Sequence, residues 1–529
     1  MVGIAIVVFG VCCLLPVGYL LTMSLTGTDG RYAAVLLDAR QRGLLYNTAL
    51  LGTGTALLAT AIGAPLGVAL ARIALPRKAL LRLTLAAPVL LPPYVVGLAW
   101  IYLGGSRGLV ATLAGRDLLS GWTYSLPAGI LVLSLVLYPL SMLATEVAMR
   151  RIDGRLEEAA LIIAPPGRVL WRITLPLAAP SIFGAALVIF VLAVSEFGVP
   201  GLLRVRVYTT EVFTAFAALY DFSRAVLVAV PLLLLCLTVA CVAAALLGER
   251  LVITRRSAGT RPAFLDAWRR AAVTGALVVV AVALGLPLAV LVREALGARS
   301  LSAVLGGSGD AIANSLVLAT AGATAVLSVA VWLGYSRARA RGRIGQVADV
   351  LFVVVFAVPT TIVGVGLIGL WNRPGVLGAV YGTDFMFLLA YLARFVPVAA
   401  LALAASTRYV PVSHEEAAAV SGAGWLRTMF RIVLPQIRLG LAAAWLISFV
   451  LAFGELGVSI LVAPPGEATL PIRIYTIIAN TPSSHVAVLA LLQTLVIFTP
   501  LAALGAAVSL RRSTCTQGVP SVVEGREGR

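Results

Sequence analysis

The segment VLAVSEFGV, residues Val191 to Val199, returns 259 positions later as VLAFGELGV, residues Val450 to Val458. Six of the nine residues are the same, and each copy carries one glutamate, Glu196 or Glu455, inside an apolar run. Chance does not easily place a carboxylate at the same point of two matching apolar segments. The chain is therefore expected to contain one hydrophobic unit written twice.

Composition indicates a membrane protein. Hydrophobic residues make up 60% of the chain and charged residues 12%, against about 45–50% and about 25% in soluble domains. A membrane-spanning helix needs about 20 mainly apolar residues. The apolar stretches predict an all-α integral membrane protein with about twelve transmembrane helices, near residues 2–25, 44–70, 83–103, 126–146, 178–199, 224–247, 271–292, 311–334, 350–370, 386–406, 437–462 and 486–508.

The net charge of +18 also has to be explained. If the amino terminus is cytoplasmic, most basic residues fall in inner loops, as the positive-inside rule requires. The clearest groups lie at 72–82, 150–172, 250–270 and 337–343. A nucleic-acid surface would instead gather basic residues with aromatics on one folded face. The pattern favours a multi-pass membrane protein with both termini in the cytoplasm, and no nucleic-acid partner.

Residues 1–25 lack the positively charged start of a signal peptide, so we expect an uncleaved first helix. Four of the five cysteines lie in predicted spans, which leaves no extracellular disulfide framework. The two histidines, His414 and His485, are expected on opposite faces of the membrane. No stretch has metal-ligand spacing, and neither a resident metal nor a cofactor is expected.

The duplication extends along most of the chain. Residues of the first copy recur at a spacing of 267 and later at 258, namely Asn47 with Asn314, Leu66-Gly67 with Leu333-Gly334, Ala71-Arg72 with Ala338-Arg339, Pro92 with Pro359, Gly97 with Gly364, Pro139 with Pro397, and Glu157 to Ala160 with Glu415 to Ala418. With six spans in each copy, both copies enter and leave on the same side. The sequence therefore predicts two parallel six-helix repeats related by an axis along the membrane normal.

The same division predicts the domain limits. The first repeat covers residues 1–247 and the second 271–510, with a basic, polar cytoplasmic linker at 248–270 between them. Residues 511–529 are predicted to form a disordered cytoplasmic tail. A central interface between the repeats is the expected transport path, although a fold alone does not establish transport.

A loop after the fourth span of each copy carries the most specific motif. In the second copy it reads Glu416-Ala417-Ala418, three residues, Gly422, nine residues, Ile432, one residue and Leu434-Pro435. Ser413 and Glu416 have capping-box spacing, and acidic residues favour the amino end of a helix. The alternative is an ordinary helix at the membrane interface, without a docking function. The loop resembles the EAA loop of ATP-binding-cassette (ABC) importer permeases, which in that family docks into the ATP-binding subunit.

The first copy departs from this pattern. It has Glu158-Ala159-Ala160, but Ala164 stands at the glycine position and Pro165-Pro166-Gly167 follows, with one residue fewer before Leu175-Pro176. A turn made with prolines still redirects the chain. The resemblance implies ATPase-coupling residues at Glu157, Glu158, Ala159, Ala160, Gly167, Glu415, Glu416, Ala417, Ala418 and Gly422.

Two further strings, LPPYVVGLAW at 91–100 and SEFGVP at 195–200, together with the fusion of two permease halves, resemble iron(III) transport permeases. The resemblance covers residues 44 to 510. It implies a small-solute path, for iron(III) first, with thiamine, phosphonate or polyamine as alternatives. It also implies two ATP-binding subunits on the cytoplasmic face and an extracytoplasmic substrate-binding protein as partners.

Glu196 and Glu455 are candidate pathway residues, because acidic groups within a bilayer normally face a cavity or a partner. They occupy equivalent places near the outer ends of spans five and eleven, and oxygen donors suit a hard trivalent cation. The alternative role is to brace a helix break beside Gly198 or Gly457. Arg394, inside span ten, is a third candidate, which needs a carboxylate or an aqueous cavity.

The sequence predicts no catalytic activity. A phosphate-binding loop needs a lysine after its glycines, and Lys78, the only lysine in the chain, follows Arg77. No serine, histidine and acid constellation stands out, which disfavours a membrane enzyme. An ion-driven secondary transporter is the rival from another class; the paired loops argue against it.

Overall fold

The computed structural model describes residues 1–26, 38–248, 264–340, 342–375 and 378–516, with the backbone alone at 244–248 and 504–516. All regular elements within these ranges are helical. The linker predicted at 248–270 lies mostly outside the described residues, and so do residues 517–529 of the predicted tail. The last helix runs to Thr516, so it enters the segment predicted as a tail.

The first half of the chain forms helices of very different length. They are α1 (Val2–Phe9), η1 (Gly10–Leu14), α2 (Leu15–Thr26), α4 (Ala39–Arg72), α5 (Lys78–Ala86), η2 (Ala87–Leu90), α6 (Pro93–Gly104), α7 (Leu109–Ala114), α8 (Ser120–Thr123), α9 (Leu126–Arg151), α10 (Gly154–Leu161), α11 (Pro166–Val169), η3 (Leu170–Thr174), α12 (Leu175–Ser195), α13 (Gly198–Leu202), α14 (Tyr208–Phe213), η4 (Thr214–Ala218) and α15 (Phe222–Gly248).

The second half repeats this order with small differences. It consists of η5 (Asp266–Trp268), α16 (Arg269–Val280), η6 (Ala281–Gly285), α17 (Leu286–Ala295), α18 (Leu301–Gly306), α19 (Gly309–Arg339), α20 (Gly342–Phe356), α21 (Thr360–Trp371), α22 (Phe385–Thr407), α23 (Val412–Val420), α24 (Trp425–Thr428), η7 (Met429–Val433), α25 (Leu434–Gln436), α26 (Arg438–Phe453), α27 (Ser459–Val462), α28 (Leu470–Ile477) and α29 (Ser483–Thr516).

The prediction of an all-α membrane protein with about twelve spans is confirmed. In the described residues, ten helices are long and apolar enough to cross a membrane. The number is up to twelve if two bent pairs each count as one span: α20 with α21, bent by 91°, and the stretch from α24 to α25 with α26, bent by 78°. The span expected at 83–103 is broken at Leu91 and Pro92, and the candidate span there begins at Pro93.

Leu-Pro pairs shape four of the helices. Wider π-helical turns end one residue before Leu15-Pro16, Leu175-Pro176, Leu286-Pro287 and Leu434-Pro435. Proline lacks a backbone N–H and its ring clashes with the preceding turn, so an α-helical hydrogen bond is lost there. A π-turn is one way in which a helix absorbs such a defect. The equivalent proline positions in the two halves therefore produce equivalent distortions.

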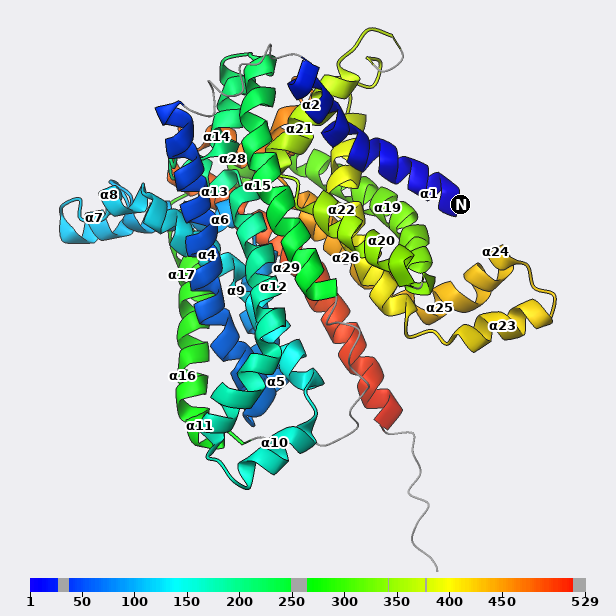
Figure 1. Ribbon diagram of the computed structural model, residues 1–529. Helices are drawn as coiled ribbons and strands as arrows, with labels where there is room; N and C mark the ends of the chain where they lie inside the picture. The colour runs from blue at the N-terminus through cyan, green and yellow to red at the C-terminus, as the bar shows by residue number, and fades with distance from the viewer. Residues whose placement is uncertain (27–37, 249–263, 341, 376–377, 517–529) are drawn as a thin grey trace, which may run out of the picture.

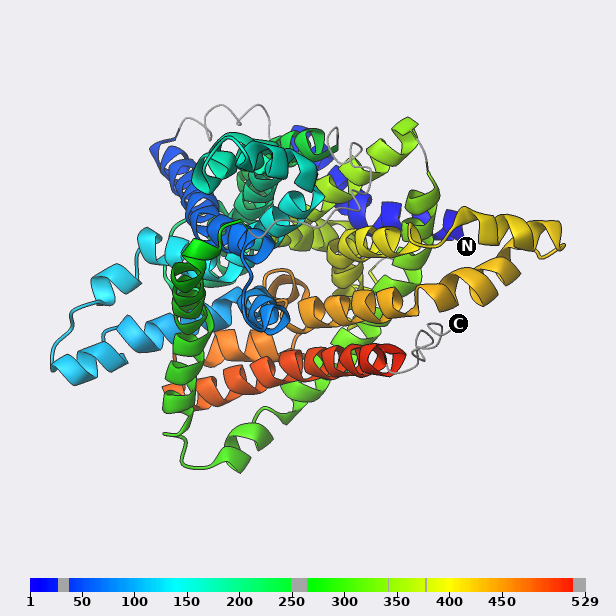
Figure 2. The ribbon, with the colours of Figure 1, turned by 90° about the horizontal axis from the view of Figure 1, so that it is seen from below.

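The leading helix of each half packs against the other half. In Figure 1, α1 and α2 lie beside α19 to α22, and contacts join α1 to α19 and α2 to α21. Likewise, α16 contacts α4 and α5, and α17 contacts α6. Seen from below, the amino-terminal helix again lies among the helices of the second half (Figure 2). Each half thus packs its first helix against the other half, and we call this arrangement the helix exchange.

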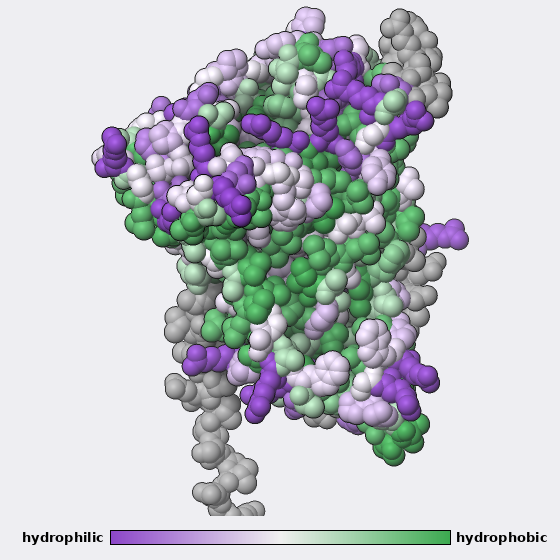
Figure 3. Space-filling model, turned by 90° about the vertical axis from the view of Figure 1, so that its left-hand side faces the viewer, coloured by the Kyte–Doolittle hydropathy of each residue, from purple (hydrophilic) through white to green (hydrophobic). Residues whose placement is uncertain are grey.

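The surface carries the apolar band that a bilayer requires. On the face shown in Figure 3, hydrophobic residues form a broad middle zone between hydrophilic residues at the two ends. Exposed side chains within the spans include Leu57, Phe183, Leu234 and Val317. In a soluble protein such patches would mark interfaces, but here acyl chains cover them.

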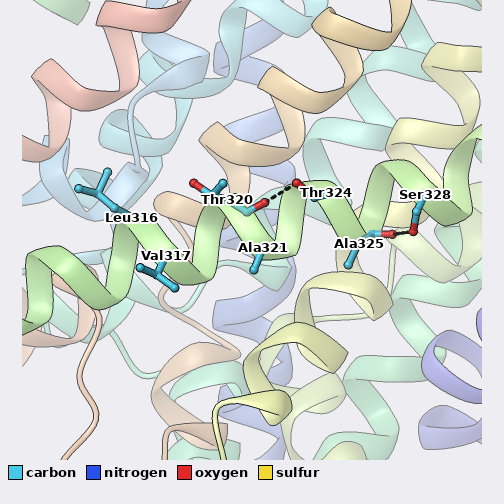
Figure 4. A pocket seen from close by; sticks show the side chains of 7 residues that line it. All are labelled: Leu316, Val317, Thr320, Ala321, Thr324, Ala325 and Ser328. Carbon is cyan, nitrogen blue, oxygen red and sulfur yellow. Dashed lines mark hydrogen bonds between the residues drawn. The ribbon is translucent and has the colours of Figure 1, made fainter.

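A shallow hollow on α19 shows that hydroxyl groups on this surface form hydrogen bonds to backbone carbonyls (Figure 4). Its lining comes from one helix: Leu316, Val317, Thr320, Ala321, Thr324, Ala325 and Ser328. The Thr324 hydroxyl donates to the Thr320 carbonyl at 2.8 Å, and the Ser328 hydroxyl to the Ala325 carbonyl at 2.7 Å. These hydroxyls are satisfied within their own helix, as a lipid-facing surface demands.

Candidate functional site

The first candidate site is a pair of arms that extend beyond the packed spans. Figure 1 shows α10 with α11 at the lower end and α23 with α24 at the right, away from α7 and α8. Each arm is a short helix, a turn, a second short helix and a π-turn that leads into a spanning helix. The two EAA-like loops of the sequence form these arms.

A buried ion pair holds the first arm. Arg72, the last residue of α4, donates through Nε to Glu157 Oε1 at 2.8 Å, and neither side chain is exposed. The Thr174 hydroxyl donates to the same oxygen at 2.9 Å, and Arg72 Nη2 donates to the Met149 carbonyl at 2.7 Å. Removal of either partner from such a buried ion pair leaves an uncompensated buried charge, which strongly destabilises the fold. Glu157 therefore anchors α10 to the end of α4.

The second arm uses the equivalent residues in a more open setting. Arg339, the last residue of α19, forms an ion pair with Glu415, and the two side chains are 19% and 16% exposed. The Tyr335 hydroxyl donates to Glu415 Oε2 at 2.7 Å, and Arg339 Nη2 donates to the Val410 carbonyl at 3.1 Å. In the sequence, the match of Ala71-Arg72 with Ala338-Arg339 is part of the repeat, but it assigns the two arginines no function. The repeat spacing that relates Arg72 to Arg339 is the sequence feature that could have indicated a shared function.

The neighbouring glutamates face the other way. Glu158 and Glu416 are exposed on α10 and α23, and the alanines Ala159 and Ala417 beside them are exposed as well. At the tips, Ile162 and Ile163 are each 85% exposed, and Val420 is 91% exposed. The exposed apolar side chains at the tips favour contact with a protein partner, and the exposed carboxylates lie beside them. In each Glu-Glu pair, the first residue holds the arm and the second faces outward.

Two details of the second arm differ from expectation. The capping box predicted from Ser413 and Glu416 is wrong, because α23 begins at Val412 after Pro411 and no side chain caps it. Proline has its φ angle pre-set and starts the helix earlier. Gly422 has φ +75°, a left-handed conformation that favours glycine. Gly167 does not take this conformation, because it lies within α11; the first arm turns at Ile162 to Ala164, and Pro165 then leads into α11.

The second candidate site is the place where both halves break their helices. α12 ends at Ser195 and α26 at Phe453, each just before the glutamate of the repeated segment. A Cβ on Gly198 would lie 2.8 Å from Tyr94 Cβ and 3.3 Å from Leu456 Cδ2. The glycine therefore allows the first break to pack directly against the second. The equivalent glutamates are thus brought to one region, as their repeat positions predicted.

Each glutamate braces its own break. Glu196 Oε1 accepts a hydrogen bond from the Gly198 N–H at 3.0 Å, and Glu455 Oε1 accepts one from the Val458 N–H, also at 3.0 Å. These N–H groups belong to the start of the next short helix, where backbone donors lack partners. Both glutamate side chains are also partly exposed, although most residues next to them in the sequence are buried. The geometry thus gives them a bracing contact and leaves room for a second role.

The broken third span of each half meets the break of the other half. The Thr360 hydroxyl, at the start of α21, donates to the Ser195 carbonyl at 3.4 Å. A Cβ on Gly454 would lie 3.0 Å from Pro92 Cγ, just before α6. The Tyr94 hydroxyl also donates to Gln493 Oε1 on α29 at 2.5 Å. These contacts join the two halves where their helices break, and we call this meeting point the central constriction.

Arg394 has carbonyls as its direct partners in addition to the expected carboxylates. It lies buried in α22, and its Nη1 donates to the carbonyls of Phe356 at 2.9 Å and Val358 at 2.7 Å. Its direct hydrogen-bond partners are carbonyls that the bend between α20 and α21 exposes, while the carboxylates of Glu455 and Glu196 interact with the guanidinium electrostatically. In the first half, the Tyr138 hydroxyl donates to the Leu85 carbonyl at 2.8 Å. Both halves thus tie the fourth span to the broken third span.

The described residues contain no group of three or more His, Cys, Asp or Glu side chains that could hold a metal ion. The two arms, the helix breaks that meet between the halves and the ten to twelve candidate spans of the described residues are features of a polytopic membrane protein.

Comparison with known proteins agrees with this class. Residues 327–513 match the family model described as binding-protein-dependent transport system inner membrane component. The Fe(3+)-transport system permease protein FbpB 2 of Haemophilus influenzae is 24% identical over 481 residues, which cover 89% of this chain and 91% of that protein. The molybdenum transport system permease protein ModB of Escherichia coli K12 is 31% identical over 158 residues, 29% of this chain and 69% of that protein.

The chain belongs to the family of binding-protein-dependent transport system inner membrane components, the permeases of ABC importers. It is a multi-pass inner-membrane protein, and its relatives are named as permease subunits of transport systems. The family match falls in the second half of the chain, while the FbpB 2 match extends over nearly all of it.

Proposed function

We propose that this chain forms the complete translocation pathway of an importer for iron(III), driven by separate ATPase subunits. The observation that carries the proposal is the pair of braced arms, each with an exposed glutamate and an apolar tip. Two such arms on one chain suit two ATP-binding subunits. The relative FbpB 2, named for Fe(3+) transport and matched over most of both chains, supports iron(III) as cargo.

The proposed mechanism follows from the contacts at the constriction. Movement of an arm acts on α12 or α26 through the π-turn that follows it. Those helices end just before Glu196 and Glu455, where the halves touch. Closing of the ATPases would draw the arms together and shift the two breaks relative to each other. Glu196 and Glu455 would then face the path, while Arg394 would keep the bend of α20 and α21 in place.

The proposed domain limits are 1–247 and 271–510 for the two halves, with a cytoplasmic linker at 248–270 and a tail at 511–529. We propose that the arms and both termini face the cytoplasm, and that α7, α8, α13 and α14 face outward, toward an extracytoplasmic substrate-binding protein. The charge distribution of the loops supports this orientation.

Reconstitution with partner proteins tests the proposal. The chain would be placed in liposomes with its ATPase and a binding protein loaded with iron(III), and uptake would be followed with and without ATP. We expect uptake that requires ATP and persists when ionophores collapse ion gradients. Native mass measurement should give two ATPases per chain. Uptake without ATP that stops with the ionophore would identify an ion-driven transporter and overturn the proposal.

Molybdate is a second candidate cargo, because the relative ModB is named for molybdenum transport. The matched region is short compared with that of FbpB 2, so iron(III) ranks first. Phosphonate is also supported by a relative, PhnU of Salmonella typhimurium, which is named for 2-aminoethylphosphonate transport and is 26% identical over 202 residues. Thiamine and polyamine rest on the fused layout alone. Competition of each compound with iron(III) in the same uptake assay ranks them directly.

A further inference from the structure

A polar cavity opens at the end of the first half that carries α13 and α14, away from α10 (Figure 1). Its volume is about 710 Å³. Phe197, which directly follows the braced Glu196, lines the cavity, and Tyr475 of α28 contributes from the second half. The cavity thus connects an exposed end of the molecule with the residues next to the central constriction.

Arginines dominate the charge of this cavity. Arg40, Arg204 and Arg206 line it together with one acidic residue, Glu211. Arg40 pairs with Glu211 at 2.9 Å, and Arg224 also approaches this carboxylate, at 3.6 Å. Arg204 and Arg206 are exposed, and the described part of the chain offers neither of them a carboxylate within ion-pair distance. The cavity therefore keeps a positive charge that Glu211 does not neutralise.

The backbone holds these two arginines in place. Arg204 has φ +56°, an uncommon conformation for a residue with a side chain, and its guanidinium lies 5.6 Å from the centre of the Tyr124 ring. The carbonyl of Arg206 accepts a hydrogen bond from Asn47 Nδ2 at 3.0 Å. Strained backbone that is held by its surroundings gathers at functional sites.

The second half of the chain provides an internal comparison. At the repeat spacing of 259, Ala463 and Pro465 stand in place of Arg204 and Arg206. Asn314, the equivalent of Asn47, instead donates to Glu467 Oε2 at 2.6 Å. The same region of the fold therefore forms without the arginines. Their presence in the first half is not required by the fold, which points to a ligand.

We propose that this cavity binds an oxygen-bearing anion and is the entry site of an anionic cargo, an assignment that rests on the proposed transport function. Guanidinium groups bind carboxylate and phosphate oxygens in pairs. A cavity of about 710 Å³ is within the range of about 300–1,000 Å³ for small-molecule sites. Iron(III) held by anionic oxygen ligands and a free oxyanion share this chemistry, and so does the phosphate of an acidic lipid.

Equilibrium binding to the full chain in nanodiscs of neutral phosphatidylcholine tests the proposal, with inorganic phosphate and citrate as separate probes. The double variant R204Q/R206Q removes both charges from exposed positions. We expect its affinity to fall by about tenfold or more, since each lost charge-assisted contact contributes about 1 kcal/mol or more. R204K/R206K retains the charge and should lie between the two. R269Q/R270Q removes two exposed arginines from the start of α16 and should bind as the unmodified chain does.

Three results of the binding measurements would overturn the proposal. They are no binding of either probe, equal binding by R204Q/R206Q, and loss of binding when the nanodisc contains phosphatidylglycerol, which would identify a lipid phosphate as the occupant. Loss of binding-protein association in R204Q/R206Q, with probe binding unchanged, would assign the arginines to an acidic protein surface and also overturn it. ATP-driven uptake by the unmodified chain is measured in parallel. Uptake without anion binding refutes this site alone, whereas absence of uptake refutes the proposed function.

Discussion

At the scale of single residues, the arms separate two adjacent glutamates by function. Glu157 and Glu415 point inward to Arg72 and Arg339, whereas Glu158 and Glu416 are exposed. The EAA-like motif does not distinguish the two members of a pair, since both are acidic and both lie at the start of a helix. Burial makes the distinction, and it leads to different expectations for the two members.

Replacement of Glu416, the outward-facing glutamate of the second arm, should weaken coupling to the ATPase and leave the stability of the fold unchanged. Glu416→Ala removes an exposed carboxylate without an intramolecular ion pair among the described residues, so we expect the thermal midpoint to stay within about 1 °C. ATP-driven uptake should fall several-fold, because the proposed contact with the ATPase is lost. Uptake and thermal unfolding of the same preparation give both values. Normal uptake in this variant would remove Glu416 from the proposed interface.

Arg72→Gln is the matched structural control. It leaves Glu157 buried without its ion-pair partner, a loss that amounts to about 3–5 kcal/mol in buried pairs. We expect a clear fall in the amount of folded protein before any effect on coupling is measurable. Arg339→Gln acts on a pair that is partly exposed and should destabilise by about 1 kcal/mol.

Glu196 and Glu455 allow bracing and pathway roles to be measured separately. Glutamine keeps an oxygen that accepts the backbone hydrogen bond, so Glu→Gln removes the charge with little change in stability. Alanine also removes the brace, at about 1 kcal/mol for each helix start. If the charges face the path, Gln at both sites should lower uptake by more than the two single changes combined. Normal uptake with Gln, together with reduced stability with Ala, would leave bracing as the function.

At the scale of elements, the two halves make the same connection with different side chains at positions that the repeat does not pair. The fourth span is tied to the third by Tyr138 through the Leu85 carbonyl in the first half, and by Arg394 through the carbonyls at the bend in the second. The Leu-Pro pairs are the same in both halves, and so are the π-turns before them. Local backbone features follow directly from local sequence, whereas the partner of a polar side chain varies.

The exchange of leading helices gives a cross-linking prediction. Phe9 of α1 and Phe352 of α20 have ring centroids 5.5 Å apart. In a background without native cysteines, Phe9→Cys and Phe352→Cys should be joined by a short bismaleimide reagent. A protease site introduced between 249 and 263 then separates the halves, and the joined fragments migrate together on a gel. Ser120→Cys with Phe352→Cys should not be joined. Separation of the Phe9 and Phe352 fragments would refute the exchange.

At the scale of the whole molecule, one chain carries two halves, two arms and a shared constriction. The arms and the α7–α8 region lie at different ends of the molecule (Figure 1), so the bilayer has to lie between them. The apolar band of Figure 3 fits this placement. Either the arms or the α7–α8 region faces the cytoplasm, and this one alternative fixes the orientation of the entire molecule.

An impermeant thiol reagent in intact cells tests that choice. Cysteines at Ser106 and Thr383, both exposed, should react from outside, while a cysteine at Ser421 on the exposed second arm should react only after the cells are opened. The native cysteines are first removed. The positive-inside rule is the physical basis of the expectation, and the reverse labelling pattern would invert the proposed topology.

The sequence by itself determined the class of protein, the number of spans, the duplication and the place of both arms. These features are local: about 20 apolar residues favour a spanning helix wherever they occur, and a repeated segment forms the same elements twice. The tertiary structure alone decided the helix exchange, the anchoring by Arg72 and Arg339, the carbonyl partners of Arg394 and the arginine-lined cavity. Each depends on side chains far apart in the chain, such as Arg72 and Glu157, which only the packing of helices brings within hydrogen-bonding distance.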